Sequence, residues 1–394
     1  MLNTPFSPWP SFTEQEIDAV SAVLRSNKVN YWTGQEGKAF EREFALFCDS
    51  KYAVAVTNGT LALDLALKVL DVKKGDEVIV TSRTFIASIS CIINAGATPI
   101  FADVELDSQN ISARTISNVI SKNTKAVMCV HLAGWPCEMD EIMALAEEYS
   151  LFVIEDCAQA HGTTYKGKPV GSIGHVGAWS FCQDKIMTTG GEGGMLTTND
   201  ETLWRDAWAY KDHGKSYAAV YETEHPAGFR WLHESFGTNW RLTEMQSAIG
   251  RIQLTRMADW KKSRTENADK IRSVCQQFSW LIVPEVPEYI EHAYYKCYVH
   301  VDTNKLPKNY SRDKIIDEIT NNGIPCFSGS CSEVYNEKAF NNSGLSPQRP
   351  LINAQELGRN SLMFLVHPTL TEDEIGKTCH ILASVFTEID QLTI

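Results

Sequence analysis

The sequence predicts an α/β protein in which a mostly parallel sheet is followed by a smaller α+β region. Short apolar runs rich in β-branched residues alternate with amphipathic helical patterns over the first two-thirds of the chain. Such alternation is typical of a parallel sheet with helices on both faces. The pattern changes near residue 255, and 394 residues exceed what one core usually serves. We therefore predict two domains, 1–255 and 256–394.

The expected strands of the first region are seven apolar stretches. They cover residues 53–57, 77–82, 98–104, 126–132, 151–156, 177–182 and 193–200. The segment DKIMTTGGE between the last two is too short for a crossover helix, so a hairpin-like excursion is expected there. Helical patterns at 61–70 and 138–150 separate earlier strands.

The C-terminal region is expected to begin within one long amphipathic helix over 242–278. A strand-like run follows at 293–302, and further helices are expected at 311–321 and 371–390. These elements suit a small α+β domain.

Composition narrows the functional class. The net charge of -13 argues against nucleic acid as the main partner. The 11 cysteines are scattered without metal-ligand spacing, so we expect free, mostly buried thiols and no metal site. No apolar run is long enough to span a bilayer, and the N-terminus lacks the pattern of a secretory signal, so a cytoplasmic location is expected.

Polar residues cluster where the predicted strands end. Ligands of open parallel sheets bind beyond the carboxyl ends of the strands. Asn58-Gly59-Thr60 closes one strand and opens a helix, which favours a phosphate site or, alternatively, a simple capped turn. Asp156 could pair with a protonated pyridine nitrogen or merely cap its strand. Gln159 could bind a phenolic ring oxygen or be a solvated loop amide.

Three further residues complete this set. Phe85 follows a strand and could stack on a flat ring or pack in the core. Ser180 ends another strand. Lys185 comes five residues later and could attack a carbonyl if partly desolvated, whereas an average lysine is a solvated surface charge. The shared location of these residues favours the chemical interpretation.

The motifs SFCQDKIMTTGGEGGMLTTND, VIEDCAQAHG, TNGTLALDLAL, TFIAS and FGTNWRLTEMQSAIG resemble the DegT/StrS-type nucleotide-sugar aminotransferases. The resemblance is close over residues 5–260 and looser beyond. It implies the type I fold of pyridoxal 5'-phosphate enzymes and a homodimer with shared active sites. Lys185 would carry the cofactor as a Schiff base and Asp156 would bind the pyridine nitrogen. The remaining cofactor contacts would be Gly59, Thr60, Phe85, Gln159, Ser180 and, across the dimer, Asn239.

The expected reaction moves an amino group from L-glutamate to a nucleotide-linked keto-sugar, with Lys185 as acid and base. A UDP-linked 4-keto-6-deoxy-N-acetylhexosamine for surface polysaccharide, such as lipopolysaccharide O-antigen, is the favoured substrate. A 3-keto sugar and a TDP or GDP carrier are alternatives. Candidate sugar contacts, for which packing or solvation stays an alternative, are Trp32, Thr33, His161, Lys211, His213 and Arg230, with Lys215 expected to be solvated.

Other functions fit the residues less well. A branch of the family with histidine in place of the lysine dehydrates sugars, and Lys185 disfavours it. A non-catalytic cofactor-binding regulator conflicts with the intact Lys185, Asp156, Gln159 and Ser180 set. A nicotinamide-dependent sugar epimerase would need a glycine-rich turn after the first strand, where the chain has TNGT. The segment IPCFSGSCSEVY lacks the Arg and His-Tyr pair of many relatives, which leaves the sugar open.

Overall fold

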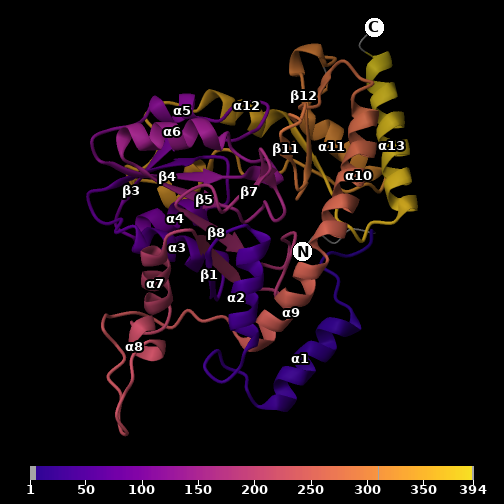
Figure 1. The fold of residues 1–394 in the computed structure, drawn as a ribbon. Helices are drawn as coiled ribbons and strands as arrows, with labels where there is room; N and C mark the ends of the chain where they lie inside the picture. The colour runs from indigo at the N-terminus through magenta and orange to yellow at the C-terminus, as the bar shows by residue number, and fades with distance from the viewer. Residues whose placement is uncertain (1–5, 309, 393–394) are drawn as a thin grey trace.

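A computed structural model describes residues 6–308 and 310–392 (Figure 1). Its main element is a seven-stranded sheet in the order β1-β9-β8-β5-β4-β2-β3. Only β9 runs antiparallel to its neighbours, which confirms the predicted parallel sheet and the hairpin-like excursion between β8 and β9. The strands are β1 (Tyr52–Val56), β2 (Glu77–Thr81), β3 (Thr98–Ala102), β4 (Thr124–Val130), β5 (Phe152–Asp156), β8 (Val176–Ser180) and β9 (Gly194–Thr198).

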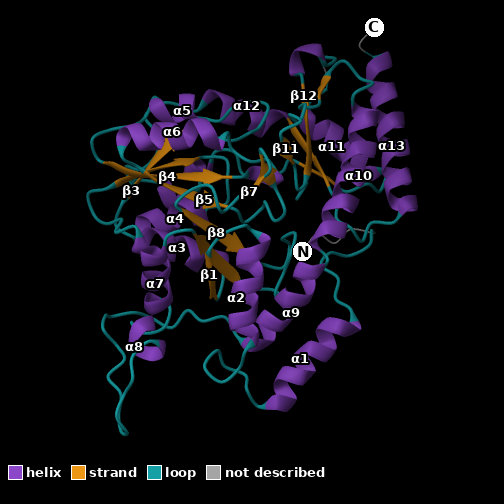
Figure 2. Ribbon diagram, in the orientation of Figure 1, coloured by secondary structure: helices purple, strands orange, loops and turns teal. Residues whose placement is uncertain are grey.

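Helices cover both faces of this sheet (Figure 2). Successive residues of a strand point to opposite faces, so Val78 and Val80 pack into one hydrophobic cluster and Ile79 into another. The helices of this region are α1 (Glu14–Ser26), α2 (Glu36–Phe47), α3 (Gly59–Val69), α4 (Ala87–Asn94), α5 (Ala113–Ser117), α6 (Met139–Tyr149), α7 (Glu201–Tyr210), α8 (Tyr217–Tyr221), α9 (Glu244–Thr255) and the 3-10 turn η1 (Leu132–Gly134). The predictions at 61–70 and 138–150 correspond to α3 and α6.

The C-terminal part builds an antiparallel four-stranded sheet in the order β10-β12-β14-β13. Helices α10 and α13 lie side by side against it (Figure 1). The strands are β10 (Leu281–Ile282), β12 (Cys297–Val301), β13 (Cys326–Phe327) and β14 (Ser361–Phe364). The helices are α10 (Met257–Cys275), α11 (Arg312–Asn321), α12 (Ile352–Asn360), α13 (Glu372–Gln391) and the 3-10 turns η2 (Thr303–Lys305), η3 (Val334–Asn336) and η4 (Lys338–Phe340).

A small three-stranded sheet joins the two parts. It has the order β11-β6-β7, and β11 (Ile290–Glu291) reaches from the C-terminal part to pair with β6 (Thr164–Tyr165), while β7 (Lys168–Pro169) forms the other edge. Residues far apart in the sequence are therefore held close beside the carboxyl ends of β4 and β5.

The prediction of one helix over 242–278 is wrong, because α9 and α10 are separate helices that meet at Arg256. Arg256 has φ -96° and ψ -3°, and its amide bonds to Gln253 and Leu254 rather than four residues back. Its guanidinium reaches the start of α1, where it bonds to Thr13 and Glu16. Apolar periodicity cannot reveal such a long-range anchor. We propose Arg256 as the boundary between the two domains.

Other expectations concern the whole chain. All 11 cysteines are free, and most of them are buried. Among the described residues, no helix combines the length and the apolar character that a membrane crossing requires. The first five residues of the segment tested for a secretory signal lie outside the described part of the chain.

Candidate active site

The start of α3 meets the end of β8 in a cradle suited to a phosphate. Asn58 caps α3, since its side chain accepts a hydrogen bond from the Leu61 amide. Within the described chain the amides of Gly59 and Thr60 have no acceptor, so both can bind an anion at the helix N-terminus. A Cβ on Gly59 would lie 2.5 Å from that of Ser180. Glycine thus allows the close approach, and the turn is both a cap and a candidate phosphate site.

Asp156 ends β5 with its carboxylate buried and oriented. Oδ2 accepts a hydrogen bond from Ser88 Oγ at 2.8 Å, and Oδ1 accepts one from the Ala158 amide at 3.1 Å. Burial raises the pKa of Asp156, while these two hydrogen bonds and the charge of Lys185 oppose the rise. A buried carboxylate in this setting suits a cationic partner such as a protonated pyridine nitrogen.

Gln159 and Phe85 follow β5 and β2, the strands on either side of β4, and differ in exposure. Gln159 is buried, and its Oε1 accepts a hydrogen bond from the Ala133 amide at 2.8 Å, which leaves its NH2 group to donate. It is therefore not a solvated loop amide. Phe85 is 68% exposed, which excludes the core-packing alternative and leaves its ring open to stack on a flat group.

Lys185 lies between the two parts of the chain. Its ammonium group sits 5.3 Å from the centroid of the Tyr295 ring, and its backbone carbonyl accepts a hydrogen bond from the Trp9 indole. The Tyr295 hydroxyl donates to Asp184, the residue before Lys185. Although burial would raise it, the pKa of Asp184 is lowered by the charge of Lys185 and by this hydrogen bond. Two distant segments, those of Trp9 and Tyr295, thus fix the lysine loop.

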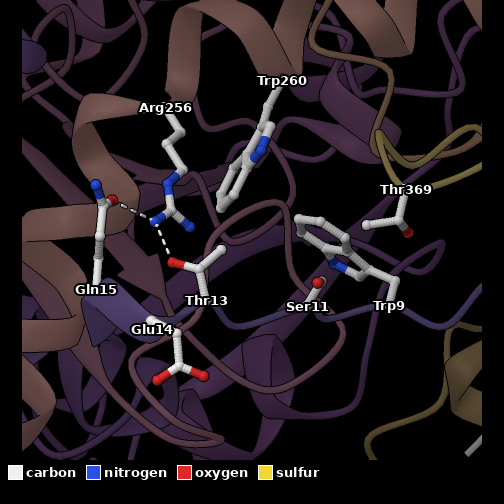
Figure 3. Close-up of a pocket in the computed structure, with 8 residues that line it drawn as sticks. All are labelled: Trp9, Ser11, Thr13, Glu14, Gln15, Arg256, Trp260 and Thr369. Carbon is white, nitrogen blue, oxygen red and sulfur yellow. Dashed lines mark hydrogen bonds between the residues drawn. The ribbon is translucent and has the colours of Figure 1, made fainter. Parts of the chain in front are cut away.

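Trp9 also borders a hollow of about 600 Å³ (Figure 3). In Figure 3, Arg256 and Trp260 line it from above, and Thr13 and Gln15 of the α1 start bond to the guanidinium. None of the cofactor candidates lines this hollow. Among its lining residues Trp9 bonds to the Lys185 carbonyl, so the hollow adjoins the lysine loop without containing the candidate cofactor residues.

The other face of the β5 end is held by Glu155. Its carboxylate accepts hydrogen bonds from the amides of Gly171, Ile173 and Gly174, and His131 Nε2 lies 2.9 Å away. His131 Nδ1 accepts from the Cys137 amide, so Nε2 carries the proton and donates to Glu155. The side chains of His131, Glu155 and Cys157 lie close enough together to hold a metal ion. The hydrogen bonds just described, however, already use both ring nitrogens of His131 and both carboxylate oxygens of Glu155. The group is a structural support for Asp156.

Two of the predicted sugar contacts are wrong, because the structure buries them. Lys211 is fully buried and its Nζ lies 2.5 Å from Glu41, so its charge is used inside the protein. His161 is fully buried beside Trp179 and Phe181, and burial lowers its pKa to about 3. Neither side chain faces an open surface where a sugar could bind.

The remaining sugar candidates differ in their surroundings. Trp32 packs edge-on against Trp208, with Lys215 Nζ 4.1 Å from its ring centroid. Lys215 also pairs with Asp212 at 3.2 Å and is therefore not a purely solvated charge. Thr33, His213, Arg230 and Asn239 are exposed. With Lys211 buried, the basic cluster expected from Lys211 and Arg230 does not form.

Sequence reasoning missed several residues that shape the site. Ser88 and Ala133 orient Asp156 and Gln159, and Trp9 and Tyr295 hold the Lys185 loop. Asp184 gave a local signal, because it stands directly before Lys185. The others come from segments whose proximity only the fold reveals.

Comparisons with known proteins agree with this geometry. The profile of the DegT/DnrJ/EryC1/StrS aminotransferase family matches residues 10–383. The chain belongs to this family. It is 34% identical to GDP-perosamine synthase of Escherichia coli O157:H7 over 96% of this chain and 98% of that protein.

Solved structures extend the comparison. An aminotransferase from Psychrobacter cryohalolentis is 64% identical, with a TM-score of 0.97 over 98% of this chain and 100% of that one. The PLP form of Spr1654 from Streptococcus pneumoniae is 26% identical, with a TM-score of 0.85 over 98% and 99% of the two chains. This protein is therefore an aminotransferase of the type I fold, and its cofactor is pyridoxal 5'-phosphate.

The residues present fit that cofactor. The free amides of Gly59 and Thr60 with the Ser180 hydroxyl suit its phosphate, and the buried Asp156 carboxylate suits its ring nitrogen. Lys185 supplies an amine for its aldehyde. These contacts come from the ends of three strands, β1, β5 and β8, and from the loop after β8, and the three strands run in the same direction within one sheet.

Proposed function

We propose that the protein transfers the amino group of L-glutamate to a UDP-linked 4-keto-6-deoxy-N-acetylhexosamine, for the synthesis of surface polysaccharide in the cytoplasm. The single observation that carries the aminotransferase chemistry is the Lys185 amine beside Asp156, with the Gly59 and Ser180 cradle on the same edge. The relatives support a nucleotide sugar as the substrate class, since one of them, GDP-perosamine synthase, is named after a nucleotide-linked amino sugar. A 3-keto sugar or a TDP or GDP carrier remains the alternative.

The cofactor, when bound, delocalises the electron pair left at the α-carbon of the amino donor. Lys185 Nζ would act as the base that takes the proton from that α-carbon and then as the acid that returns a proton. Asp156 keeps the proton on the pyridine nitrogen, and Ser88 holds the carboxylate in position. Gln159 would donate a hydrogen bond to the ring oxygen, and Phe85 would stack on the ring. Gly59, Thr60 and Ser180 bind the phosphate.

The active site is completed, in this proposal, by a second copy of the chain. Residues 222–239, here called the aromatic arm, leave the body after α8 (Figure 1). The arm exposes Phe229 by 80%, Trp231 by 84% and Phe236 by 99%. Large apolar side chains exposed together indicate a protein interface. Asn239 stands exposed at the base of the arm, where it can bind the phosphate in the partner's site.

Hybrid dimers test this sharing. Lys185→Ala and Asn239→Ala chains, each nearly inactive alone, are mixed, unfolded and refolded together. If Asn239 serves the partner, one site of each hybrid has both native residues, and activity recovers to about a quarter of the wild-type value for random pairing. No recovery, with hybrids demonstrated by mass spectrometry, contradicts the shared site.

The sugar is tested separately. The holoenzyme is incubated with L-glutamate and a panel of UDP-, TDP- and GDP-linked 3-keto and 4-keto sugars, and products are identified by mass spectrometry. We expect the UDP-linked 4-keto-6-deoxy-N-acetylhexosamine to give the highest kcat/KM. A higher value for another sugar corrects the substrate, while no product from any sugar contradicts the proposed reaction.

A further inference from the structure

A second lysine amine lies beside Lys185. Lys296 directly precedes β12, and its Nζ is 4.9 Å from the centroid of the Tyr295 ring. Lys185 Nζ is 5.3 Å from the same centroid. Both amines therefore lie near one aromatic ring, although Lys296 comes from the C-terminal part of the chain and Lys185 from the loop between β8 and β9.

The positive charge of Lys296 is not balanced. Within residues 6–308 and 310–392, no carboxylate lies within ion-pair distance of its Nζ, and Asp184, the acid that influences it, bonds to Tyr295. Arg264 adds a second, fully buried cation that donates to the carbonyls of Tyr294 and Tyr295. Burial lowers the pKa of Lys296 to about 8. A partly buried, unpaired cation of this kind is costly unless an anion joins it.

The position of Lys296 indicates which anion this is. Lys296 borders a small cavity that is also lined by Ala133 and Tyr298. The amide of Ala133 bonds to Gln159, the residue proposed to bind the cofactor's ring oxygen. In pyridoxal 5'-phosphate, that oxygen sits on the carbon next to the one bearing the aldehyde. The amine of an α-amino acid reacts at this aldehyde, and only the α-carbon separates that amine from the carboxylate. We therefore expect the carboxylate of the bound amino acid to lie close to this cavity.

We propose that Lys296 binds the carboxylate of the amino-acid donor and so selects amino acids over amines without a carboxylate. The proposal rests on the proposed function, because it assumes a cofactor at Lys185. Arg264 supports the role as a second cation near Lys296, and the centroid of the Tyr295 ring lies 4.9 Å from the Lys296 amine and 5.3 Å from the Lys185 amine. The nucleotide diphosphate of the second substrate is the competing anion, and the experiment distinguishes it.

The test compares two alkoxyamines on the yellow holoenzyme. Methoxyamine and aminooxyacetate share the same nucleophile, displace Lys185 from the cofactor and bleach its visible absorbance, but only aminooxyacetate has a carboxylate. In Lys296→Met, the rate-constant ratio of aminooxyacetate to methoxyamine is expected to fall by about tenfold or more, as for loss of a charged hydrogen bond. Lys296→Arg, which keeps the charge, is expected to restore most of the ratio. The KM for L-glutamate rises in parallel in Lys296→Met.

Each outcome decides the proposal. An unchanged ratio in Lys296→Met overturns it, and weaker binding of UDP-N-acetylglucosamine in the same variant then assigns Lys296 to the diphosphate. An equal fall of both rate constants also overturns it, because a purely structural change affects both nucleophiles. Wild-type protein that is colourless and does not react with methoxyamine shows instead that the cofactor assignment to Lys185 has failed.

Discussion

The strand ends around Lys185 and the segment 211–241 use their polar side chains differently. At the strand ends, hydrogen-bonding capacity remains free, as in the amides of Gly59 and Thr60. In the segment 211–241, the amines of Lys211 and Lys215 already pair with Glu41 and Asp212. The first region is therefore prepared for a ligand, whereas the lysines of the second stabilise the fold.

This difference gives a criterion for interpreting charged residues. A lysine in a functional motif binds ligand only if the protein leaves its charge unpaired and reachable. Lys185 and Lys296 have no carboxylate within ion-pair distance in the described part of the chain, and Lys211 does. The contrast can be tested by replacing each lysine and measuring both the rate of the reaction and the free energy of unfolding.

Replacing Lys185 is expected to have the largest effect. Lys185→Ala loses both the covalent attachment and the acid-base group. The rate at which L-glutamate converts the cofactor from its aldehyde form to its amine form is therefore expected to fall about 10³-fold or more. Stopped-flow absorbance measures this rate. The matched control is Lys122→Ala at an exposed loop position, for which no change is expected. A Lys185→Ala enzyme within tenfold of wild type would falsify the assignment.

Asp156→Asn is expected to rank second. Asparagine keeps the size of the side chain and a bond to Ser88 but loses the negative charge that stabilises a protonated pyridine nitrogen. The rate of the L-glutamate reaction is expected to fall about 10²–10³-fold, as for removal of one preorganised electrostatic contact. Asp18→Asn on the exposed side of α1 is the control. Equal rates in both variants would mean that Asp156 has only a capping role.

The same contrast explains how far the sequence predicts this molecule. All seven strands of the large sheet and the residues at their ends are encoded locally, by apolar runs followed by polar residues. Contacts between residues far apart in the sequence are not encoded in this way. Nothing in the sequence shows that Glu41 pairs with Lys211, or that the Arg256 side chain at the end of α9 bonds to the start of α1. Lys296 is missed for the same reason, because its proximity to Lys185 depends on how the C-terminal part packs.

Lys211→Met is expected to affect stability more than substrate binding. It leaves the Glu41 carboxylate buried without its cation, which costs about 3–5 kcal/mol of unfolding free energy. A lower urea midpoint with an unchanged KM for the nucleotide sugar is expected. The additional Glu41→Gln change should recover part of the loss, since the two residues are coupled. A raised KM with normal stability would return Lys211 to the substrate site.

Lys215→Met provides the comparison for that variant. Lys215 is partly exposed, and Asp212 keeps its second partner Arg241, so the expected loss is only about 1 kcal/mol or less. The same urea titration measures it. A loss as large as that of Lys211→Met would show that burial does not distinguish the two ion pairs.

The smallest expected effect is a pH dependence of donor selection. The pKa of Lys296 is lowered to about 8, so its amine is charged below this pH and loses its charge above it. Binding of a carboxylate is then present at pH 7 and lost toward pH 9. The ratio of aminooxyacetate to methoxyamine rate constants is expected to fall severalfold over this interval. Any effect of pH that acts equally on both reagents cancels in this ratio.

The groups that face Lys296 determine how this profile is interpreted. Arg264 and Lys185 disfavour its charge, and Asp184 favours it, while Tyr295 and His367 are further titratable neighbours. The cavity beside Lys296 adds the charged or titratable side chains of Asp107, Arg272, His292, Tyr294 and Tyr298, and burial lowers the pKa of His292 to about 3. His367 has its pKa lowered to about 3 by burial and stays neutral throughout the interval. Lys296→Met should therefore give a flat ratio between pH 7 and 9. A fall that persists in this variant would assign the titration to another group, and Lys296 would then resemble Lys211, a lysine whose charge serves the fold alone.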